Sequence, residues 1–390
     1  MKFAAFKNVW NRELRVMFSR PIYLFSTVFV MGFCYIFFLT MMNEGLPERL
    51  PVAIVDLDNS AISRRFYREL NATQAVEVVS KCSSYTEARD LLQKGDIYGF
   101  ILVPRDFYKN LLGNKRPEIS FYVNNTYLVA GTLAYRDMLT MSTLAPAAYQ
   151  REILRKKGMA DDDAIMGRIQ PIVIDSHLIG NPWSNYGVYL INLLLPGVLQ
   201  LMIILMTVFS IGIELKERSS REWLAAGNGS IVTALTGKLL PYTILFSILG
   251  IAGNVLLYKF IGYPMNGSFA LFSIATFLFV VAHQAIGIFM IGLFPVLRDG
   301  ISFGALYGIL SFTYAGFTFP IDAMPPLAQG PSILFPMRHY FQIYTNEVLN
   351  GAPFAYSIVY YAALLSFLIL PFIIVRRLEK ALINQNYPLK

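Results

Sequence analysis

The feature that most constrains this chain is an apolar run over residues 188–213 that ends abruptly in the charged segment 214–222, ELKERSSRE. The run carries no charge and is longer than the stretch of about 20 apolar residues that a helix needs to cross a bilayer. The charged segment is too polar to lie in lipid and too short to form a domain. Apolar sequence resumes at Leu239. We therefore predict two membrane spans joined by a loop over residues 214–238, and we expect a partner protein to bind this loop.

The composition of the 390-residue chain agrees with several spans, because 55% hydrophobic and 15% charged residues are too apolar for an ordinary soluble protein. We predict an α-helical polytopic membrane protein with six transmembrane helices and an inserted α/β extracytoplasmic domain. The predicted spans cover residues 22–42, 188–213, 239–261, 269–293, 301–319 and 354–375. The predicted parts are a cytoplasmic interfacial helix at 1–20, the first transmembrane helix at 21–42, the domain at 43–183, a five-helix region at 184–376 and a cytoplasmic tail at 377–390.

The distribution of charge predicts the orientation. Residues 1–20, 214–238, 294–300 and 376–390 together hold 14 basic and 6 acidic residues, an excess equal to the net charge of +8, whereas residues 43–183 hold 17 of each sign. Cytoplasmic loops are enriched in Lys and Arg, so both termini and the loop are expected on the cytoplasmic side of the inner membrane. The same distribution argues against nucleic-acid binding, because no basic stripe lies on a soluble domain.

Alternating strand and helix signals fill residues 43–183. Strands are predicted at 51–57, 76–79, 98–103 and 119–123, with a returning strand at 172–174. Asn59 and Ser60 can cap one helix, and a capping box at Ser84 starts another that ends at Gly95. Asp56 and Asp58 follow the first strand, and a turn capped by Asp accounts for them better than a metal or catalytic pair. The pattern predicts a small α/β domain with a largely parallel sheet.

Residues 126–157 are expected to form one long helix. Its apolar stretch, 127–149, could be mistaken for a further span, but Arg136 and Asp137 lie in its middle, where each would cost about 2.5–3.5 kcal/mol. A span here would also reverse the side on which the basic loop lies. We expect the helix to pack on the domain, on the membrane or along a neighbouring subunit, and the sequence leaves these alternatives open.

The loop 214–238 has the composition of an element that couples to a soluble partner. Mixed charge would come from Glu217, Arg218, Arg221 and Glu222, and apolar anchors from Trp223 and Leu224. An ordinary inner loop that merely follows the charge rule is the alternative.

The loop also carries a sequence resemblance. Residues 216–224 (KERSSREWL), a turn near Asn228 and residues 236–242 (TGKLLPY) resemble the first cytoplasmic loop of ABC-2 type transport permeases. Two departures are Ser219-Ser220 in place of Gly-Thr, and Gly227-Asn228 in place of a turn that contains proline. Both affect the geometry of turns more than contact with a partner.

A second resemblance lies in the segment 320–353 and the residues just before it. Its motifs Phe-Pro, Met-Pro and Pro-x-Arg-x-Tyr follow the order of that family's outer segment, and they comprise Phe319, Pro320, Met324, Pro325, Pro336, Arg338 and Tyr340. Because proline breaks helices that would otherwise cross, we expect half-helices that close an outer gate. A proline-rich external loop is the alternative. We expect Arg338 to pair with Glu347 or with a lipid phosphate.

The insert resembles the extracytoplasmic domain of the multidrug-type branch of these permeases. The resemblance implies the permease subunit of an ATP-binding-cassette exporter that moves a hydrophobic or amphipathic substrate, either a drug or a lipid-like molecule. It also implies a homodimer or a pair with a paralogous permease, and a separate ABC ATPase that binds ATP and Mg²⁺. In double-membrane bacteria it further implies an HlyD-like periplasmic adaptor and an outer-membrane duct.

The sequence offers no enzyme site of its own. No Gly-x4-Gly-Lys-[Ser/Thr] loop is present to hold nucleotide phosphates, so we predict that this chain is not an enzyme and binds no cofactor or metal. Cys34 and Cys82 are not expected to form a disulfide. His283 and Gln284 lie inside a predicted span, where an ionisable residue indicates function and a neutral hydrogen bond between helices is the alternative. A non-transporting receptor or scaffold whose exported domain binds a partner is the alternative function.

Overall fold

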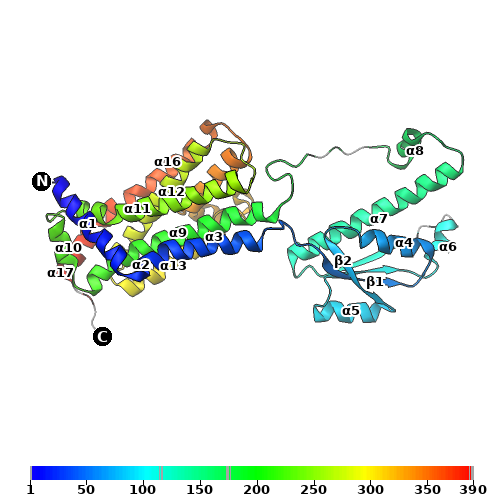
Figure 1. Cartoon of the computed structure of the whole chain (residues 1–390), viewed down its shortest axis with the longest axis horizontal. Helices are drawn as coiled ribbons and strands as arrows, with labels where there is room; N and C mark the ends of the chain where they lie inside the picture. Colours follow the sequence, from blue (N-terminus) through cyan, green and yellow to red (C-terminus); the bar gives the residue numbers. More distant parts are fainter. Residues whose placement is uncertain are drawn as a thin grey trace. The chain divides into compact units, whose positions relative to one another are not determined.

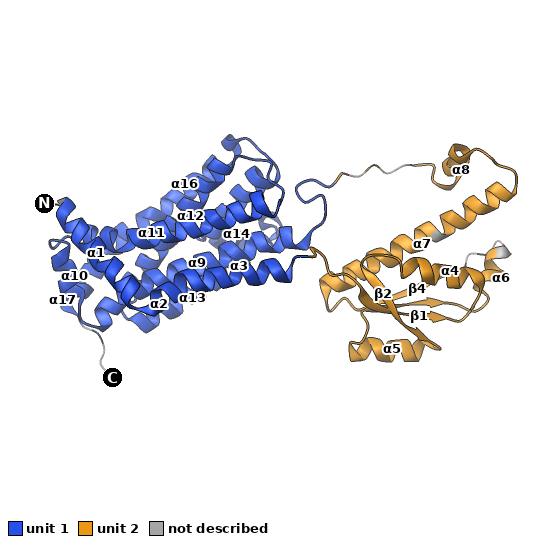
Figure 2. Cartoon of the chain, in the orientation of Figure 1, with its two compact units in different colours: residues 1–43, 178–390 blue, residues 44–177 orange. Residues whose placement is uncertain are grey.

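The computed structural model describes residues 2–113, 115, 117–172, 175, 177–385 and 387. The chain divides into two compact units (Figures 1 and 2). Unit 1 comprises residues 1–43 and 178–390, and unit 2 comprises Glu44–His177. The boundaries of unit 2 differ from the predicted 43–183 chiefly at the C-terminal end, where residues 178–183 belong to unit 1.

Unit 2 is built on a four-stranded sheet with strand order β2-β1-β3-β4. The strands are β1 (Leu50–Asp56), β2 (Val76–Cys82), β3 (Gly99–Val103) and β4 (Ser120–Val123). β1 pairs in parallel with both β2 and β3, whereas β4 pairs antiparallel with β3. The central strands are therefore parallel, as the alternation of strands and helices predicts, and β4 is the exception. The predicted returning strand at 172–174 includes residues 173 and 174, which lie outside the described residues.

The helices of unit 2 begin where local capping signals place them. They are α4 (Ala61–Leu70), α5 (Tyr85–Lys94), α6 (Phe107–Leu112), α7 (Leu128–Lys156) and α8 (Asp162–Ile169). Ser60 and Ser84 accept hydrogen bonds from the third residue after each, and Gly95 ends α5 with a φ of 83°. Asp56 accepts the backbone N–H groups of Asp58 and Asn59 at 3.1 and 2.9 Å. The prediction of a capped turn at the end of β1 is thus confirmed.

The long helix α7 packs on the sheet of its own unit. Ala134, Met138 and Met141 are buried in the core that the sheet shares with α4. Asp137 accepts the backbone N–H of Ala75 at 3.1 Å, so this mid-helix charge is used inside the domain. Of the three packing alternatives that the sequence left open, the structure shows the contact with the domain.

Unit 1 is a bundle of helices, and five of those described are long and apolar enough to cross a membrane. They are Pro21–Met41 (α2 Pro21–Leu24, η1 Phe25–Phe29 and α3 Val30–Met41), Tyr186–Lys216 (α9), Ile231–Phe260 (α11 Ile231–Val255 and η2 Leu256–Phe260), Phe269–Leu293 (α12) and Ile358–Asn384 (α16 Ile358–Ser366, η6 Phe367–Ile369 and α17 Leu370–Asn384). The predicted span at 301–319 corresponds to α13 (Leu297–Thr313), which has 17 residues, against 21 in the shortest of the five.

Shorter helices complete unit 1. They are α1 (Lys2–Ser19), α10 (Ser220–Ala226), η3 (Ile321–Ala323), α14 (Pro326–Ser332), α15 (Pro336–Ile343), η4 (Tyr344–Leu349) and η5 (Phe354–Tyr356). α9 lies at the centre of the bundle and packs against α12, α13 and α3, while α1 packs along α11. Large side chains such as Phe33, Ile36 and Phe37 on α3 are exposed, which suits a surface that faces lipid.

Two predicted boundaries are corrected. Ser230 caps α11 by accepting the N–H of Thr233, so the helix begins at Ile231 and not at Leu239. The predicted loop 214–238 is therefore shorter, and its last charged residue, Lys238, lies inside a helix. At the other end of the chain, α17 continues through the basic segment to Asn384, so most of the predicted tail is helical.

Candidate functional site

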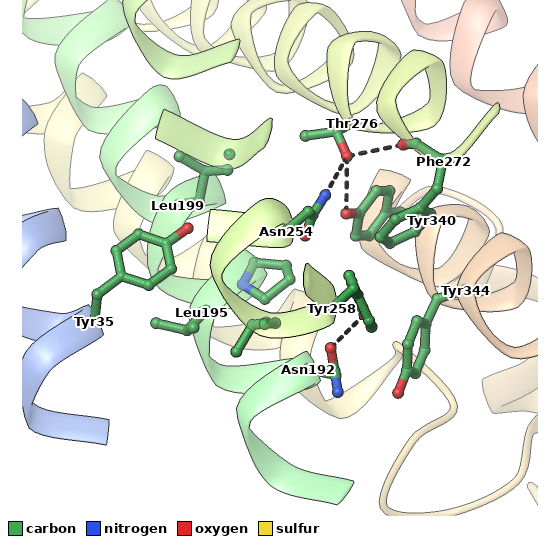
Figure 3. Close-up of a pocket in the computed structure, with 13 residues that line it drawn as sticks. Tyr35, Asn192, Leu195, Leu199, Asn254, Tyr258, Phe272, Thr276, Tyr340 and Tyr344 are labelled. Atoms are coloured by element: carbon green, nitrogen blue, oxygen red, sulfur yellow. Dashed lines mark hydrogen bonds between the residues drawn. The ribbon is translucent and has the colours of Figure 1, made fainter. Parts of the chain in front are cut away.

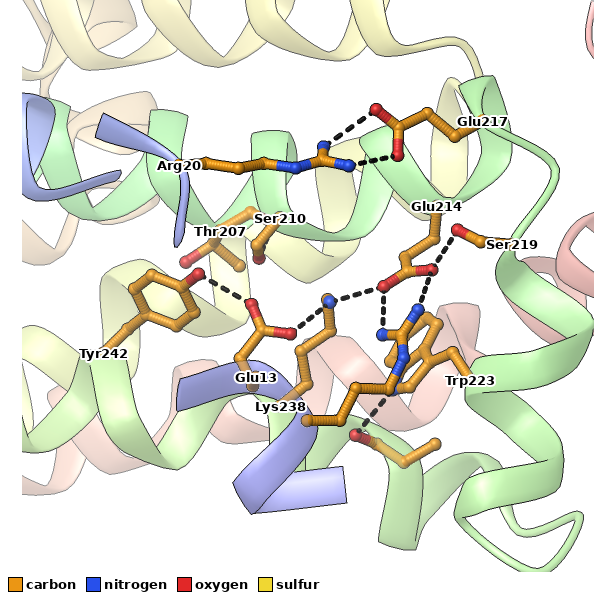
Figure 4. A network of polar contacts seen from close by, with 12 residues as sticks. Glu13, Arg20, Thr207, Ser210, Glu214, Glu217, Ser219, Trp223, Lys238 and Tyr242 are labelled. Atoms are coloured by element: carbon orange, nitrogen blue, oxygen red, sulfur yellow. Dashed lines mark hydrogen bonds and ion pairs between the residues drawn. The ribbon is translucent and has the colours of Figure 1, made fainter. Parts of the chain in front are cut away.

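A buried network of charges joins the N-terminal helix to the two helices that flank the predicted coupling loop. Lys238 on α11 lies at its centre (Figure 4). The Nζ atom of Lys238 is 2.5 Å from Oε2 of Glu13 on α1 and 2.8 Å from Oε1 of Glu214 on α9. All three side chains are buried, with 0% of Lys238 exposed to solvent. Helices α1, α9 and α11 thus meet at one ammonium group, although α1 lies far from the other two in the sequence.

The remaining carboxylate oxygens of the network also have partners. Arg12 donates two parallel hydrogen bonds to Glu214, at 2.5 and 2.9 Å, and the hydroxyl of Ser219 donates to the same carboxylate. The hydroxyl of Tyr242 donates to Oε1 of Glu13 at 2.7 Å. Two acids and two bases leave no net charge in the network. This balance explains its burial, because an unpaired ion away from water costs several kcal/mol.

Trp223 closes the network on the side of α10. Its ring centroid lies 5.0 Å from the Lys238 ammonium, within the range of a cation–π interaction, and its indole N–H donates to the carbonyl of Ala234 at 3.3 Å. The side chain is fully buried. Trp223 therefore fastens α10, the helix inside the loop, to α11 and to the charge network.

α1 packs closely against α11 because residue 237, next to Lys238, is a glycine. A methyl group at Gly237 would lie 2.8 Å from Cβ of Val9 and 3.2 Å from the carbonyl oxygen of Phe6. Only a residue without a side chain allows so close an approach. The sequence Gly237-Lys238 thus combines a contact surface for α1 with the charge that neutralises Glu13.

Of the six coupling-loop residues that the sequence predicts, four are exposed and two are not. Glu217, Arg218, Arg221 and Glu222 are exposed, whereas Trp223 and Leu224 are buried. The prediction that Trp223 and Leu224 serve as apolar anchors for a partner is corrected, because both side chains pack inside this chain. The four charged side chains are the part of the predicted set that faces solvent.

Two of the exposed residues also hold the loop to the rest of unit 1. Glu217 forms a double hydrogen bond with Arg20, which follows α1, with both distances 2.8 Å. Arg221 donates from Nε to the carbonyl of Ile383 at 2.8 Å, near the end of α17. The loop is therefore a fixed surface bound by the first and last helices of the chain.

Sequence reasoning missed Glu13, Glu214 and Lys238 as a site. The buried face of α1 runs through Val9, Glu13 and Met17 at intervals of four residues, so Glu13 lies in line with the apolar residues on either side of it. An acid on the apolar face of an amphipathic helix is the signal that could have found it. Nothing in the sequence says which distant base it meets.

The predicted outer gate segment folds into short helices, and two of them, α14 and α15, begin with proline. Pro326 begins α14 and Pro336 begins α15, at the position where a missing N–H costs nothing. Among the predicted gate residues, Met324, Pro336 and Tyr340 are buried, Arg338 is half-buried, and Phe319, Pro320 and Pro325 are exposed. The motifs thus place α15 in the interior and leave the start of the segment at the surface.

The sequence suggested an ion pair between Arg338 and Glu347, but the structure does not contain it. Its guanidinium donates to the carbonyl of Gln329 at 3.2 Å and to the hydroxyl of Ser332. Glu347 accepts instead from the hydroxyl of Tyr361 at 3.0 Å. Arg338 thus holds α15 to the end of α14.

Tyr340 reaches a small polar cavity inside the bundle (Figure 3). Its hydroxyl lies 3.1 Å from that of Thr276, which in turn accepts from Asn254 at 2.9 Å. The cavity has a volume of about 20 Å³, enough for a single water molecule. α15 is therefore linked by polar side chains to α11 and α12.

His283 and Gln284 have different surroundings. Gln284 accepts from the hydroxyl of Thr243 at 2.7 Å and so links α12 to α11. Nδ1 of His283 lies 2.8 Å from the carbonyl of Phe279 on its own helix, and the ring is fully buried. The alternative of a neutral hydrogen bond between helices describes Gln284 but not His283.

Comparison with known proteins places the chain in a family. The profile of the family described as ABC-2 family transporter protein matches residues 21–377. The match includes Glu214 and Lys238 and leaves α1 outside. A curated relative, the linearmycin resistance permease protein LnrN of Bacillus subtilis (strain 168), is 22% identical over 363 residues, which cover 87% of this chain and 90% of the relative. The chain therefore belongs to the ABC-2 family of transporter proteins and is a multi-pass membrane permease.

Proposed function

We propose that this chain is the permease subunit of an ABC exporter in the inner membrane, and that a separate ATPase subunit supplies the energy. The ATPase binds ATP and Mg²⁺, and this chain binds neither. In this proposal the permease spans the membrane six times, with α13 as the fifth span, and both termini are cytoplasmic. It works as a homodimer or with a paralogous permease.

The observation that carries the proposal is the buried contact of Lys238 with Glu13 and Glu214. A subunit driven by a separate ATPase needs a rigid connection between the surface that the ATPase touches and the helices that enclose the substrate path. Here the exposed charges of Glu217, Arg218 and Glu222 lie directly after α9. Movement of that surface is transmitted to α9, α11 and α1 together, because one network of ion pairs holds the three helices.

The substrate that we propose is a hydrophobic or amphipathic molecule, a drug or a lipid-like compound. The name of the relative, linearmycin resistance permease protein, supports a drug as the exported compound. The segment 320–353 would form the outer gate, with Tyr340 at its inner end. Unit 2 would lie outside the membrane and guide the substrate outward or dock an HlyD-like adaptor that leads to an outer-membrane duct.

The test is co-purification from the native membrane in mild detergent, followed by mass spectrometry and assays of ATP hydrolysis. An ATPase with a Walker loop is expected to co-purify, and charge reversal at Glu217, Arg218 and Glu222 is expected to abolish its stimulation. The matched control is Asp322→Lys, an exposed acid in the predicted outer segment, which should change nothing. Recovery without any ATPase across several detergents would refute the proposal and favour a receptor or scaffold.

A further inference from the structure

Unit 2 contains an apolar groove that the proposed transport path does not explain. The groove has a volume of about 470 Å³ and lies between α4, α6 and α7. Most of its lining is apolar or aromatic, and it includes Ile62 on α4, Phe107 and Leu111 on α6, and Ala148, Tyr149 and Ile153 on α7. Sites for small molecules have volumes of about 300–1,000 Å³ and a predominantly apolar lining. The groove therefore has the size and the surface of a small-molecule site.

The groove exists because α7 extends beyond the core on which its first half packs. Among the α7 side chains that the structure describes, Met141 is the last one buried against the sheet. The second half of the helix is held by α8, since Arg151 and Arg155 both bind Asp162, at 2.8 and 2.7 Å. The larger side chains of Tyr149, Ile153 and Leu154 on this half are only half-buried. This fixed second half of α7 forms one wall of the groove.

The charged residues at the groove neutralise one another. Arg65 lies 2.7 Å from Glu69 and 3.9 Å from Glu152, and Lys156 lies 2.7 Å from Glu152. Two bases and two acids therefore leave no net charge for a ligand to meet. A charged ligand would have to give up its hydration without gaining an ionic partner.

From this combination we infer that the groove binds an uncharged amphipathic molecule with an extended apolar chain. The inference rests on the proposed function, because such a molecule is what the exporter would deliver to unit 2. The apolar chain lies against the aromatic and aliphatic lining, and a neutral polar end meets the paired charges at the rim through hydrogen bonds. The groove thereby holds the substrate after it has left the membrane.

The inference can be tested with the full chain reconstituted in lipid nanodiscs. The probe is a long-chain alkanol that carries a diazirine, and the sites of photo-crosslinking are mapped by mass spectrometry. Two further probes with the same chain carry a trimethylammonium and a sulfate head. Saturable adducts of the alkanol on lining residues of α4, α6 and α7 are expected. Adducts confined to the helices of unit 1, or stronger labelling of the groove by either charged probe, would overturn the inference.

A matched pair of variants separates the groove from the rest of α7. Ala148 is exposed and lines the groove, so Ala148→Trp fills it without disturbing the core. Excluding about two methylene groups of the probe is expected to lower labelling about tenfold. Gln150→Trp, an exposed position of the same helix outside the lining, should leave labelling unchanged. Equal labelling of the two variants would contradict the inference. If the ATPase co-purifies in that case, the groove assignment alone has failed and the exporter proposal stands.

Discussion

Lys238 and Glu13 are 225 residues apart in the sequence, yet the ammonium and carboxylate groups are 2.5 Å apart and both are buried. Replacing Lys238 by Met leaves Glu13 without a cation and Glu214 with Arg12 alone. Breaking a buried ion pair by removing one partner typically costs about 3–5 kcal/mol. We therefore expect Lys238→Met to lower the midpoint of thermal unfolding of the detergent-solubilised protein substantially.

The control for this variant is Lys216→Met, which removes an exposed lysine at the end of α9. Surface substitutions of this kind usually change stability by no more than about 0.5 kcal/mol. If both lysine variants unfold at the same temperature, the network does not stabilise the bundle.

Gly237→Ala should separate α1 from α11. The added methyl group would lie 2.8 Å from Cβ of Val9, and overpacking of this kind costs about 1–3 kcal/mol. We expect lower thermal stability and faster proteolysis of α1 in the folded protein. Gly32→Ala is the control, because a methyl group at Gly32 on α3 meets no atom within 4 Å. That variant should be neutral or slightly stabilising, and a loss of stability there equal to that of Gly237→Ala would refute the steric explanation.

The surface pair of Arg20 and Glu217 allows the structural role of Glu217 to be separated from contact with a partner. Both side chains are more than two-fifths exposed, so either single charge reversal should change stability by no more than about 1 kcal/mol. The exchange Arg20→Glu with Glu217→Arg restores the ion pair. If Glu217 touches the ATPase, this exchange restores thermal stability while stimulated ATP hydrolysis stays lost. Recovery of both would show that Glu217 acts only through Arg20.

These network residues also show where prediction from sequence ends. The helix starts at Ser60 and Ser84 depend on neighbours within four residues, and so they could be predicted. The pairing of Glu13 with Lys238 depends on how α1 lies against α11, which no local pattern encodes. The start of α11 at Ile231 has the same local signal, a cap at Ser230, and it was missed because the charge of Lys238 was assigned to the loop. In the sequence alone, Lys238 has the pattern of the last charged residue of a loop. Its place inside a helix is explained only by its two carboxylate partners, Glu13 and Glu214.

The number of spans can be decided by labelling single cysteines. With Cys34 and Cys82 replaced, cysteines would be placed one at a time at the exposed positions Lys7, Asp322 and Lys380. Six spans predict that Lys7 and Lys380 react with an impermeant maleimide only from the cytoplasmic side, and Asp322 only from the outside. If α13 does not cross, Asp322 and Lys380 exchange sides. Exposed Glu222 serves as the cytoplasmic reference in either case.

Acid should release α8 from α7. Hydrogen bonds from Arg151 and Arg155 lower the pKa of Asp162 below its ordinary value, which is about 3.9. A carboxylate whose pKa is lowered in the folded state stabilises the fold above its unfolded pKa, and loses that effect as the pH falls through the folded pKa. The tether is therefore complete at neutral pH and is lost below about pH 4.

The same release can be produced at neutral pH by Asp162→Asn. Hydrogen exchange of the α8 amides, followed by mass spectrometry, should then become faster than in the unmodified protein. Asp163→Asn changes the adjacent exposed acid and should leave the exchange unchanged. Unaltered exchange in Asp162→Asn would show that contacts of the buried Ile165 hold α8 without the ion pairs.

The charge balance of the network also bears on how the chain is made. Glu13 is synthesised 225 residues before Lys238, the cation that neutralises it. α1 therefore docks only after the third long helix of unit 1 has been inserted. It docks only if that helix enters in the correct direction, because an inverted α11 would carry Lys238 to the opposite face of the membrane. Docking of α1 on the buried Lys238 thus depends on the orientation in which the later helix α11 was inserted.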